Sequence, residues 1–316
     1  MTRSDYTRGL HDVGDGLYAY LQPDGGWGWS NAGLVVDGES TLLVDTLFDL
    51  KLTGEMLAEM KRRVPAAGTI DTLVNTHANG DHTFGNQLAQ GARIVATTKT
   101  AGEMLEGLPP SALEALGEAA PQMGKLGEFM LECFGSFDFS GIDLTPPNET
   151  FDGELQLQVG GRDVQLIEVG PAHTMGDTLV LVPGDRVLFS GDILFHGGHP
   201  IVWAGPVSNW LAACDRILGL DEDVIVPGHG PLADKEAVRE LRSYFEYVQT
   251  EARKRFEAGM TPLEAARDIS LDKYARWGEA ERIVVNVDAV YRELSESDEP
   301  SNPIDLFGQM AELAKG

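Results

Sequence analysis

The chain has 316 residues, of which 50 are acidic and 24 are basic, so its formal net charge at pH 7 is −26. This charge repels nucleic-acid backbones and anionic membranes, so we expect no nucleic-acid and no membrane partner. The first residues contain no apolar signal core, and no apolar stretch is long enough to cross a bilayer, so the expected compartment is the cytoplasm.

Short β-branched runs alternate with helical patterns in the first part of the chain. The run TLLVD (41–45) predicts a strand, and a helical pattern follows it over about 50–63. IDTLVNT (70–76) and ARIVAT (92–97) predict two more strands, with 84–90 as the helix between them. This alternation is typical of an α/β fold.

Residues 107–148 have the composition of an insertion. The segment is apolar and rich in methionine, and Gly and Pro interrupt its helical periodicity. We predict either a lid over a substrate or a helical hairpin at the edge of the fold.

The second half repeats the same rhythm and then becomes helical. We predict buried strands over 163–169, 178–182, 186–190 and 223–227. We predict helices over 209–220 and 234–259. A short and a longer helix follow within 261–294. We therefore expect one domain over 1–294, with a helical C-terminal part over 234–294. In the polar tail, 295–316, a short amphipathic helix would dock on the domain or mediate self-association as a homodimer.

Histidines and aspartates gather where the predicted strands end. THANGDH (76–82) holds His77, Asp81 and His82. Further along the chain, His173 lies in GPAHTMGDT, Asp192 in LFSGDILF and His229 in VPGHGP. Imidazole and carboxylate are the non-sulfur ligands that zinc prefers, and the carboxyl ends of strands are where α/β sheets bind ligands. A hydrophobic core has no need of four such histidines, so the pattern predicts a metal site.

The order and context of these segments resemble the metallo-β-lactamase superfamily over about residues 29–231. The resemblance implies an αββα sandwich, with two mixed sheets face to face, helices outside and the site at one edge. It also implies two adjacent metal sites. The first would use His77, Asn79 and His173, the second would use Asp81, His82 and His229, and Asp192 would bridge them with a water molecule.

Asn79 departs from that family pattern, which has histidine at this position. An amide oxygen is a weaker zinc ligand than an imidazole. Either Asn79 ligates through its oxygen, or water fills the gap, or the protein works with one tightly held zinc ion and a possible second. Because the weakened first site is the one that the iron dioxygenases of the superfamily use, hydrolysis is favoured over redox iron chemistry.

Zinc lowers the pKa of bound water to about 7 and so supplies hydroxide at neutral pH. We expect this hydroxide to attack an acyl carbon, with Asp81 and Asp192 as the catalytic carboxylates that orient it. Asp81 would also carry a proton to the leaving group. The sequence has no GxSxG nucleophile elbow.

Two aromatic segments are candidate substrate walls. GGWGWSN (25–31) contributes Trp27 and Trp29, and FHGGHPIVWAGP (195–206) contributes His196, His199 and Trp203. The two tryptophans of the first segment bind substrate or pack against strands. The two histidines of the second segment support the metal ligands or donate to an oxyanion.

Thioesters, esters and lactones are the acyl substrates that we favour. An alternative comes from THANGDH, HPIVWAGPVSNW and the C-terminal segment, which are similar to actinobacterial members of the superfamily. Some of those members act as polyketide cyclases or thioesterases on a carrier-bound chain. An alternative of another class is a non-catalytic metal-binding or interaction protein, with Asn79 as the first sign of lost catalysis.

Overall fold

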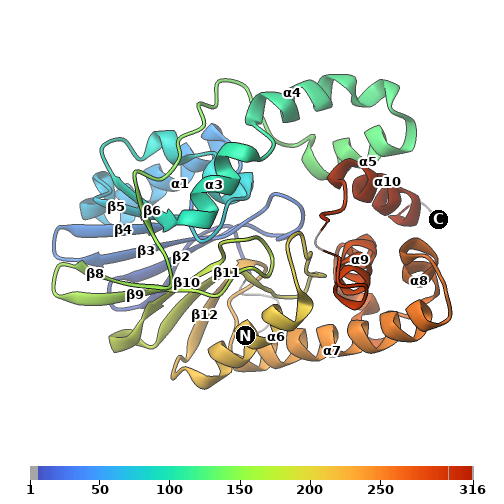
Figure 1. The fold of residues 1–316 in the computed structure, drawn as a ribbon. Helices are drawn as coiled ribbons and strands as arrows, with labels where there is room; N and C mark the ends of the chain where they lie inside the picture. Colours follow the sequence, from blue (N-terminus) through green and yellow to red (C-terminus); the bar gives the residue numbers. More distant parts are fainter. Residues whose placement is uncertain (1–5, 298, 315–316) are drawn as a thin grey trace.

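The computed structural model describes residues 6–297 and 299–314 as two β-sheets with helices outside them (Figure 1). The first sheet has the order β1-β2-β3-β4-β5-β6-β7, and the second has the order β12-β11-β10-β9-β8. The strands of the first sheet are β1 (Gly9–Gly14), β2 (Leu17–Leu21), β3 (Ala32–Asp37), β4 (Ser40–Val44), β5 (Thr72–Val74), β6 (Arg93–Thr97) and β7 (Glu149–Phe151). Those of the second are β8 (Glu154–Val159), β9 (Arg162–Glu168), β10 (Thr178–Val182), β11 (Val187–Phe195) and β12 (Val224–His229).

Both sheets are mixed, as expected. In the first, β1 to β4 pair antiparallel and β4 to β7 pair parallel. In the second, only the β11–β12 pair is parallel. One buried cluster joins residues of both sheets, among them Val35 and Val44 from the first and Val180 and Phe189 from the second. The sheets therefore pack face to face, and the predicted αββα sandwich is confirmed.

Helices cover the outer face of each sheet (Figure 1). On the first sheet lie α1 (Leu50–Arg63) and α3 (Thr98–Glu106), and on the second lie α6 (Val207–Gly219) and α7 (Lys235–Glu257). Helix α1 begins where Asp49 accepts a hydrogen bond from the backbone N–H of Leu52. Among the described residues, no helix is long and apolar enough to span a membrane.

Two local predictions were wrong. Residues 84–90 do not form an α-helix: the chain makes the short helix α2 (Gly80–Thr83) and then a 3-10 turn, Asn86–Leu88. A Cβ at Gly85 would overlap the side chain of Thr53 on α1. The chain therefore packs closely against α1 at the position where we predicted a helix. Strand β11 is longer than predicted, so Asp192 lies inside it and not beyond its end.

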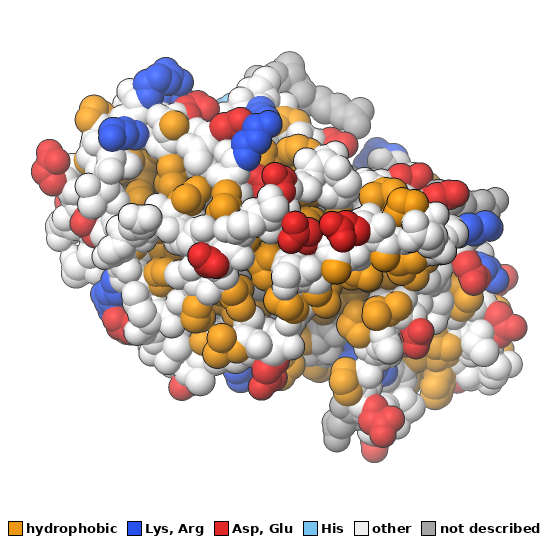
Figure 2. Space-filling model, turned by 90° about the horizontal axis from the view of Figure 1, so that it is seen from above, with side chains coloured by type: hydrophobic (Ala, Val, Ile, Leu, Met, Phe, Trp, Pro, Cys, Tyr) orange, Lys and Arg blue, Asp and Glu red, His pale blue; other side chains and the backbone are white. Residues whose placement is uncertain are grey.

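The predicted insertion is tied to the core. It contains α4 (Pro110–Ala119) and α5 (Gly124–Phe134), and after them Phe137 and Phe139 are buried against Phe48. Removing the whole segment would therefore uncover the core as well as any substrate wall. In Figure 2, hydrophobic side chains form a band across the face seen from above, with acidic side chains among them.

The C-terminal part adds α8 (Pro262–Asp268), α9 (Ile283–Leu294) and α10 (Pro303–Ala314). Helix α10 lies against α5 (Figure 1), and Leu306 and Met310 on it are buried. The tail helix thus packs on its own chain, while homodimer formation stays a prediction.

The contact between the two sheets can be tested at Gly33 on β3. A Cβ at this position would overlap the ring of Phe189 on β11. We expect Gly33→Ala to lower the free energy of unfolding by about 1–3 kcal/mol, because the ring must move within a packed core. Gly184→Ala is the control, since nothing lies within 4 Å of its Cβ position. Denaturant unfolding of both variants measures the effect, and equal stability would contradict the contact.

Candidate metal centre

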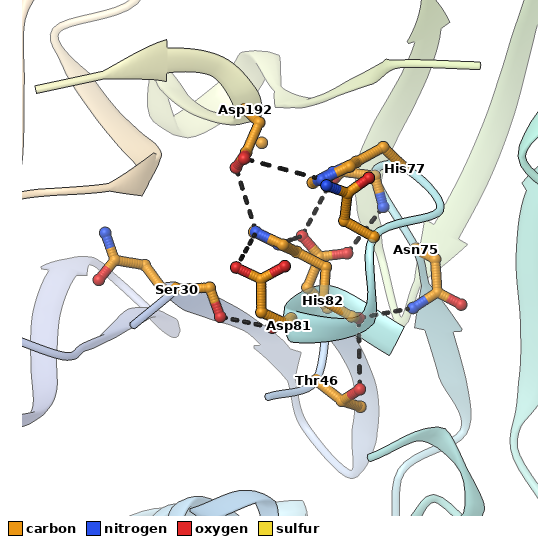
Figure 3. A network of polar contacts seen from close by, with 12 residues as sticks. Ser30, Thr46, Asn75, His77, Asp81, His82 and Asp192 are labelled. Atoms are coloured by element: carbon orange, nitrogen blue, oxygen red, sulfur yellow. Dashed lines mark hydrogen bonds and ion pairs between the residues drawn. The ribbon is translucent and has the colours of Figure 1, made fainter. Parts of the chain in front are cut away.

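The segment after β5 carries four of the seven predicted ligands, and buried side chains hold its backbone (Figure 3). Asn75 donates to the carbonyl oxygen of His82 at 3.1 Å, and Thr46 donates to the same oxygen at 3.3 Å. The hydroxyl of Ser30 donates to the carbonyl oxygen of Asp81. Contacts within the protein therefore fix the backbone of this segment without a metal ion. They also fix the positions of its imidazoles and its carboxylate relative to one another.

Asp192 lies at the centre of the cluster. Its Oδ1 is 3.1 Å from Nε2 of His82. Its Oδ2 is 3.3 Å from Nε2 of His173, 3.4 Å from that of His229 and 3.8 Å from that of His77. The pairing of β11 with β12 shifts register around Gly191, which has a φ of +49°. This irregularity in the strand places the following carboxylate among the four rings.

Asp81 completes the second half of the cluster. Its Oδ2 is 3.2 Å from Nε2 of His229 and 3.9 Å from that of His82. Two groups have ligand atoms within 4.8 Å of one another: His77 with His82 and Asp192, and Asp81 with His82 and His229. The structure thus brings together six of the seven predicted ligands, and His82 belongs to both of these groups.

Every imidazole of the cluster is held through its outer nitrogen. Nδ1 of His173 donates to the carbonyl oxygen of Ile201 at 2.7 Å, and Nδ1 of His229 donates to that of Gly25 at 3.0 Å. Nδ1 of His82 lies 2.9 Å from the Asp45 carboxylate, and Nδ1 of His77 lies 3.0 Å from the hydroxyl of Thr76. A proton on Nδ1 leaves the lone pair on Nε2, the atom that points inward. This is the arrangement that supports metal-binding histidines.

The inward atoms fit a metal ion. The Nε2 atoms of His77, His82 and His173 and Oδ1 of Asp192 are buried and have no hydrogen-bond partner within the described part of the chain. Buried polar atoms seldom lack a partner. The donor set of imidazole nitrogen and carboxylate oxygen, without thiolate, suits zinc. This buried His/Asp cluster is consistent with a binuclear metal site.

The pKa values of the cluster histidines shift in opposite directions. Burial lowers the pKa of His77 and His173, which favours their neutral form. Burial also lowers the pKa of His229, but Asp192 and Asp81 outweigh it and raise that pKa to about 9. A metal ion at His229 therefore has to displace a proton, and its binding should strengthen as pH rises.

Asn79 immediately precedes α2 and is half-buried. Its side chain does not cap the helix, so the amide has no role in holding α2. Its backbone carbonyl accepts hydrogen bonds from His82 and Thr83, which fixes its backbone beside the cluster. Whether its amide oxygen ligates stays a prediction.

Asp45 is a functional residue that the sequence reasoning missed. It is buried, has a φ of +61° and accepts hydrogen bonds from the backbone N–H and the hydroxyl of Thr76 at 2.7 and 2.6 Å. Asp45 also contacts His82, so it orients both the backbone at Thr76 and the imidazole of His82. It directly follows β4, so the strand-end position that identified His77 would have identified it too.

Trp27 and Trp203 lie next to the cluster. Trp27 follows Gly25, whose carbonyl holds His229, and the backbone N–H of Trp203 donates to the carbonyl oxygen of His173 at 3.1 Å. Both rings are half-buried and contact Phe307 of α10, at centroid distances of 5.5 and 5.8 Å. Trp27 also meets Phe134 of α5 at 5.9 Å. Trp27, Phe134, Trp203 and Phe307 therefore form one aromatic cluster that includes side chains of α5 and α10, and Trp27 and Trp203 belong to segments whose backbone also contacts His229 and His173.

The other three candidate wall residues lie outside the aromatic cluster, although the backbone N–H of His196 donates to the carbonyl oxygen of His229 at 3.0 Å. Trp29 packs on Phe137 at a centroid distance of 4.9 Å, within the core outside the first sheet. Both ring nitrogens of His199 are engaged, one by the Tyr244 hydroxyl and one by the carbonyl oxygen of Tyr274. His196 is half-buried and its Nδ1 contacts the carbonyl oxygen of Pro231. The structure thus gives Trp29 and His199 packing roles.

Comparison with known proteins agrees with this geometry. The sequence model of the metallo-beta-lactamase superfamily matches residues 25–229. The chain belongs to this superfamily. A metallo-beta-lactamase from Pontibacter korlensis superposes with a TM-score of 0.55 at 19% identity, over 75% of this chain and 99% of that one. A sec-alkylsulfatase from Pseudomonas sp. superposes with a TM-score of 0.67 at 16% identity, over 94% of this chain and 53% of that one.

Two curated members of the superfamily are similar in sequence. The 2,4-dinitroanisole O-demethylase subunit alpha of Nocardioides sp. (strain JS1661) is 26% identical over 72% of this chain and 64% of its own length. The linear primary-alkylsulfatase of Pseudomonas sp. (strain ATCC 19151) is 28% identical over 40% of this chain and 26% of its own length. The chain therefore spans less than two thirds of either relative.

The weakened position at Asn79 predicts unequal metal sites. We expect one zinc ion to stay through purification and a second to bind only at higher zinc, because an amide oxygen donates less charge than an imidazole. Asn79→His should give two tightly held ions. Elemental analysis with zinc titration of both proteins measures the stoichiometry. Two equally tight ions in the unaltered protein would contradict the prediction.

Proposed function

We propose that this chain is a metal-dependent hydrolase that cleaves an ester-type bond in a small molecule with an apolar body. The observation that carries the proposal is the set of buried, inward Nε2 atoms of His77, His82 and His173, which have no hydrogen-bond partner among the described residues. The donor set suits a Lewis acid that activates water, and the aromatic rings suit an apolar group. Carboxylic esters, thioesters and lactones are the acyl substrates of first choice.

Zinc ions bound by the cluster would supply Lewis acidity and lower the pKa of water to about 7. The four imidazoles would bind the metal, and Asp192 contacts all four of them. The Asp81 side chain is 13% exposed, against 3% for Asp192, so it is the carboxylate better placed to meet a substrate. Asp81 would orient the attacking water and pass its proton to the leaving oxygen. Trp27 and Trp203 would bind the apolar group and keep other water away.

The relatives favour a second candidate, a sulfate ester or an activated aryl ether. Their names give an alkylsulfatase and a demethylase of 2,4-dinitroanisole. Both kinds of substrate combine an apolar group with an oxygen leaving group. No relative named above is a thioesterase or a cyclase, so the carrier-bound polyketide substrate has the weaker support.

A substrate panel with the zinc-loaded protein tests the proposal. We would compare 4-nitrophenyl butyrate, a butyryl thioester, a γ-lactone, hexyl sulfate and 2,4-dinitroanisole. At least one compound should be hydrolysed, and a chelator should abolish turnover until zinc is restored. Asp192→Ala should lose most bound metal and at least about a thousand-fold in kcat/KM, because water activation depends on the metal.

Asp221→Ala is the matched control, since this carboxylate is 88% exposed and contacts only Arg186 among the described residues. It should keep both metal and activity. Full metal content and activity in Asp192→Ala would contradict the site. A zinc-loaded protein that hydrolyses nothing on the panel would favour the non-catalytic metal-binding alternative.

A further inference from the structure

Asn286 is a fully buried amide on α9, outside the metal cluster. Its Nδ2 donates to the carbonyl oxygen of Pro200 at 2.8 Å, and its Oδ1 accepts from the backbone N–H of Val202 at 3.1 Å. Nδ2 also donates to the hydroxyl of Tyr244 on α7 at 3.0 Å. Asparagine is mostly exposed in proteins, so an amide that is buried and bonded at both of its polar atoms indicates a specific use.

The peptide unit between Ile201 and Val202 connects this amide with the metal cluster. The peptide is trans, so its carbonyl and its N–H point in opposite directions within one rigid plane. On one side, Asn286 accepts from the N–H of Val202. On the other side, the carbonyl oxygen of Ile201 accepts from Nδ1 of His173 at 2.7 Å. The orientation of the carbonyl that holds His173 is therefore fixed by Asn286 from the far side of the peptide.

Residues 199–206 form no helix or strand, although they hold both the ring and the backbone of His173. The backbone N–H groups of Trp203 and Ala204 donate to the carbonyl oxygen of His173, each at 3.1 Å. No regular ladder of backbone hydrogen bonds orders this segment. Side chains from other parts of the chain therefore have to bond to its buried backbone groups.

Helix α9 and the residue before it also hold the two ends of this segment. Nη1 of Arg282 donates to the carbonyl oxygen of His199 at 2.9 Å, and the carboxylate of Glu293 accepts from the N–H of Val207 at 3.1 Å. Neither contact involves the peptide that meets the metal cluster. Among the described residues, Asn286 is the side chain whose hydrogen bonds flank the carbonyl of that peptide.

We propose that Asn286 is a positioning residue of the metal centre, which orients His173 by fixing the peptide between Ile201 and Val202. This rests on the proposed function, because it concerns a metal ion bound by that imidazole. Without the amide, the N–H of Val202 and the carbonyl of Pro200 would be buried without partners, and the peptide would have to turn to find others. A turned carbonyl no longer holds Nδ1, and outer partners of this kind decide how well a histidine binds its metal.

The effect should be confined to one half of the cluster. His173 belongs to the half that we predict to bind the weaker zinc ion. Asp81 and His229 belong to the other half, where the carbonyl oxygen of Gly25 holds the imidazole. A loss of affinity at one ion therefore distinguishes positioning from a general loss of stability, which would weaken both ions.

Zinc titration against a chromophoric chelator tests the assignment on Asn286→Leu, because leucine has the same branched outline and makes no side-chain hydrogen bond. We expect the weaker zinc ion to bind about tenfold more weakly than in the unaltered protein, since the loss of an outer partner costs at least that much in metal affinity. The tighter ion should keep its affinity within about twofold. Equal losses at both ions, or no loss at either, would overturn the assignment.

Val284→Ala is the control for the packing of α9. Val284 is fully buried and lies two residues before Asn286, on nearly the opposite side of the helix, because successive residues are turned by about 100°. The variant should lower the free energy of unfolding and keep both zinc affinities within about twofold. A loss at the weaker ion equal to that of Asn286→Leu would count against the assignment.

Tyr244→Phe is a second variant, which serves if Asn286→Leu does not fold. It keeps the ring and removes the hydroxyl that accepts from Asn286, so we expect a loss of about threefold at the weaker ion. Unchanged zinc affinity in this variant would then overturn the assignment. A selective loss of zinc affinity with no hydrolysis of any ester would support it and contradict the proposed function alone.

Discussion

One carboxylate contacts imidazoles from three parts of the chain. Asp192 lies within 3.1 to 3.8 Å of the Nε2 atoms of four histidines. Two of these follow β5, one follows β9 and one ends β12, so they come from both sheets. The sandwich is what brings these strand ends to one edge. A shift of one sheet against the other would separate the ligands, and the packing of Phe189 against Gly33 opposes such a shift.

Two imidazoles of the cluster are held by backbone carbonyls and two by side chains. Carbonyl oxygens of Gly25 and Ile201 hold two imidazoles, and the buried carboxylate of Asp45 holds a third. Gly25 and Ile201 each lie two residues before a tryptophan of the aromatic cluster, and Asp45 directly follows β4. Metal ligands, their supports and the aromatic cluster are therefore parts of one packed unit, which is the arrangement that pre-organised sites require.

Local signals in the sequence predicted the alternation of strands and helices and the His/Asp residues of the cluster, and the resemblance to a known superfamily added the sandwich and the division into two metal sites. Strand periodicity and the His/Asp residues at strand ends lie in short segments that can be recognised one at a time. The supports could not be predicted in this way, since carbonyls such as those of Gly25 and Ile201 have no signature in sequence. His199 could not be assigned from sequence either. Its glycine-rich context suggests a site residue, but Tyr244 and Tyr274, far along the chain, engage both of its ring nitrogens.

We propose that Asp192 bridges two metal positions. Anomalous X-ray scattering at the zinc edge, from crystals grown with zinc, tests it directly. The account predicts two peaks beside the Asp192 carboxylate, a stronger one on the side of Asp81 and His229 and a weaker one on the side of His77 and His173. No peak within bonding distance of Asp192, or zinc bound only elsewhere on the protein, would contradict it.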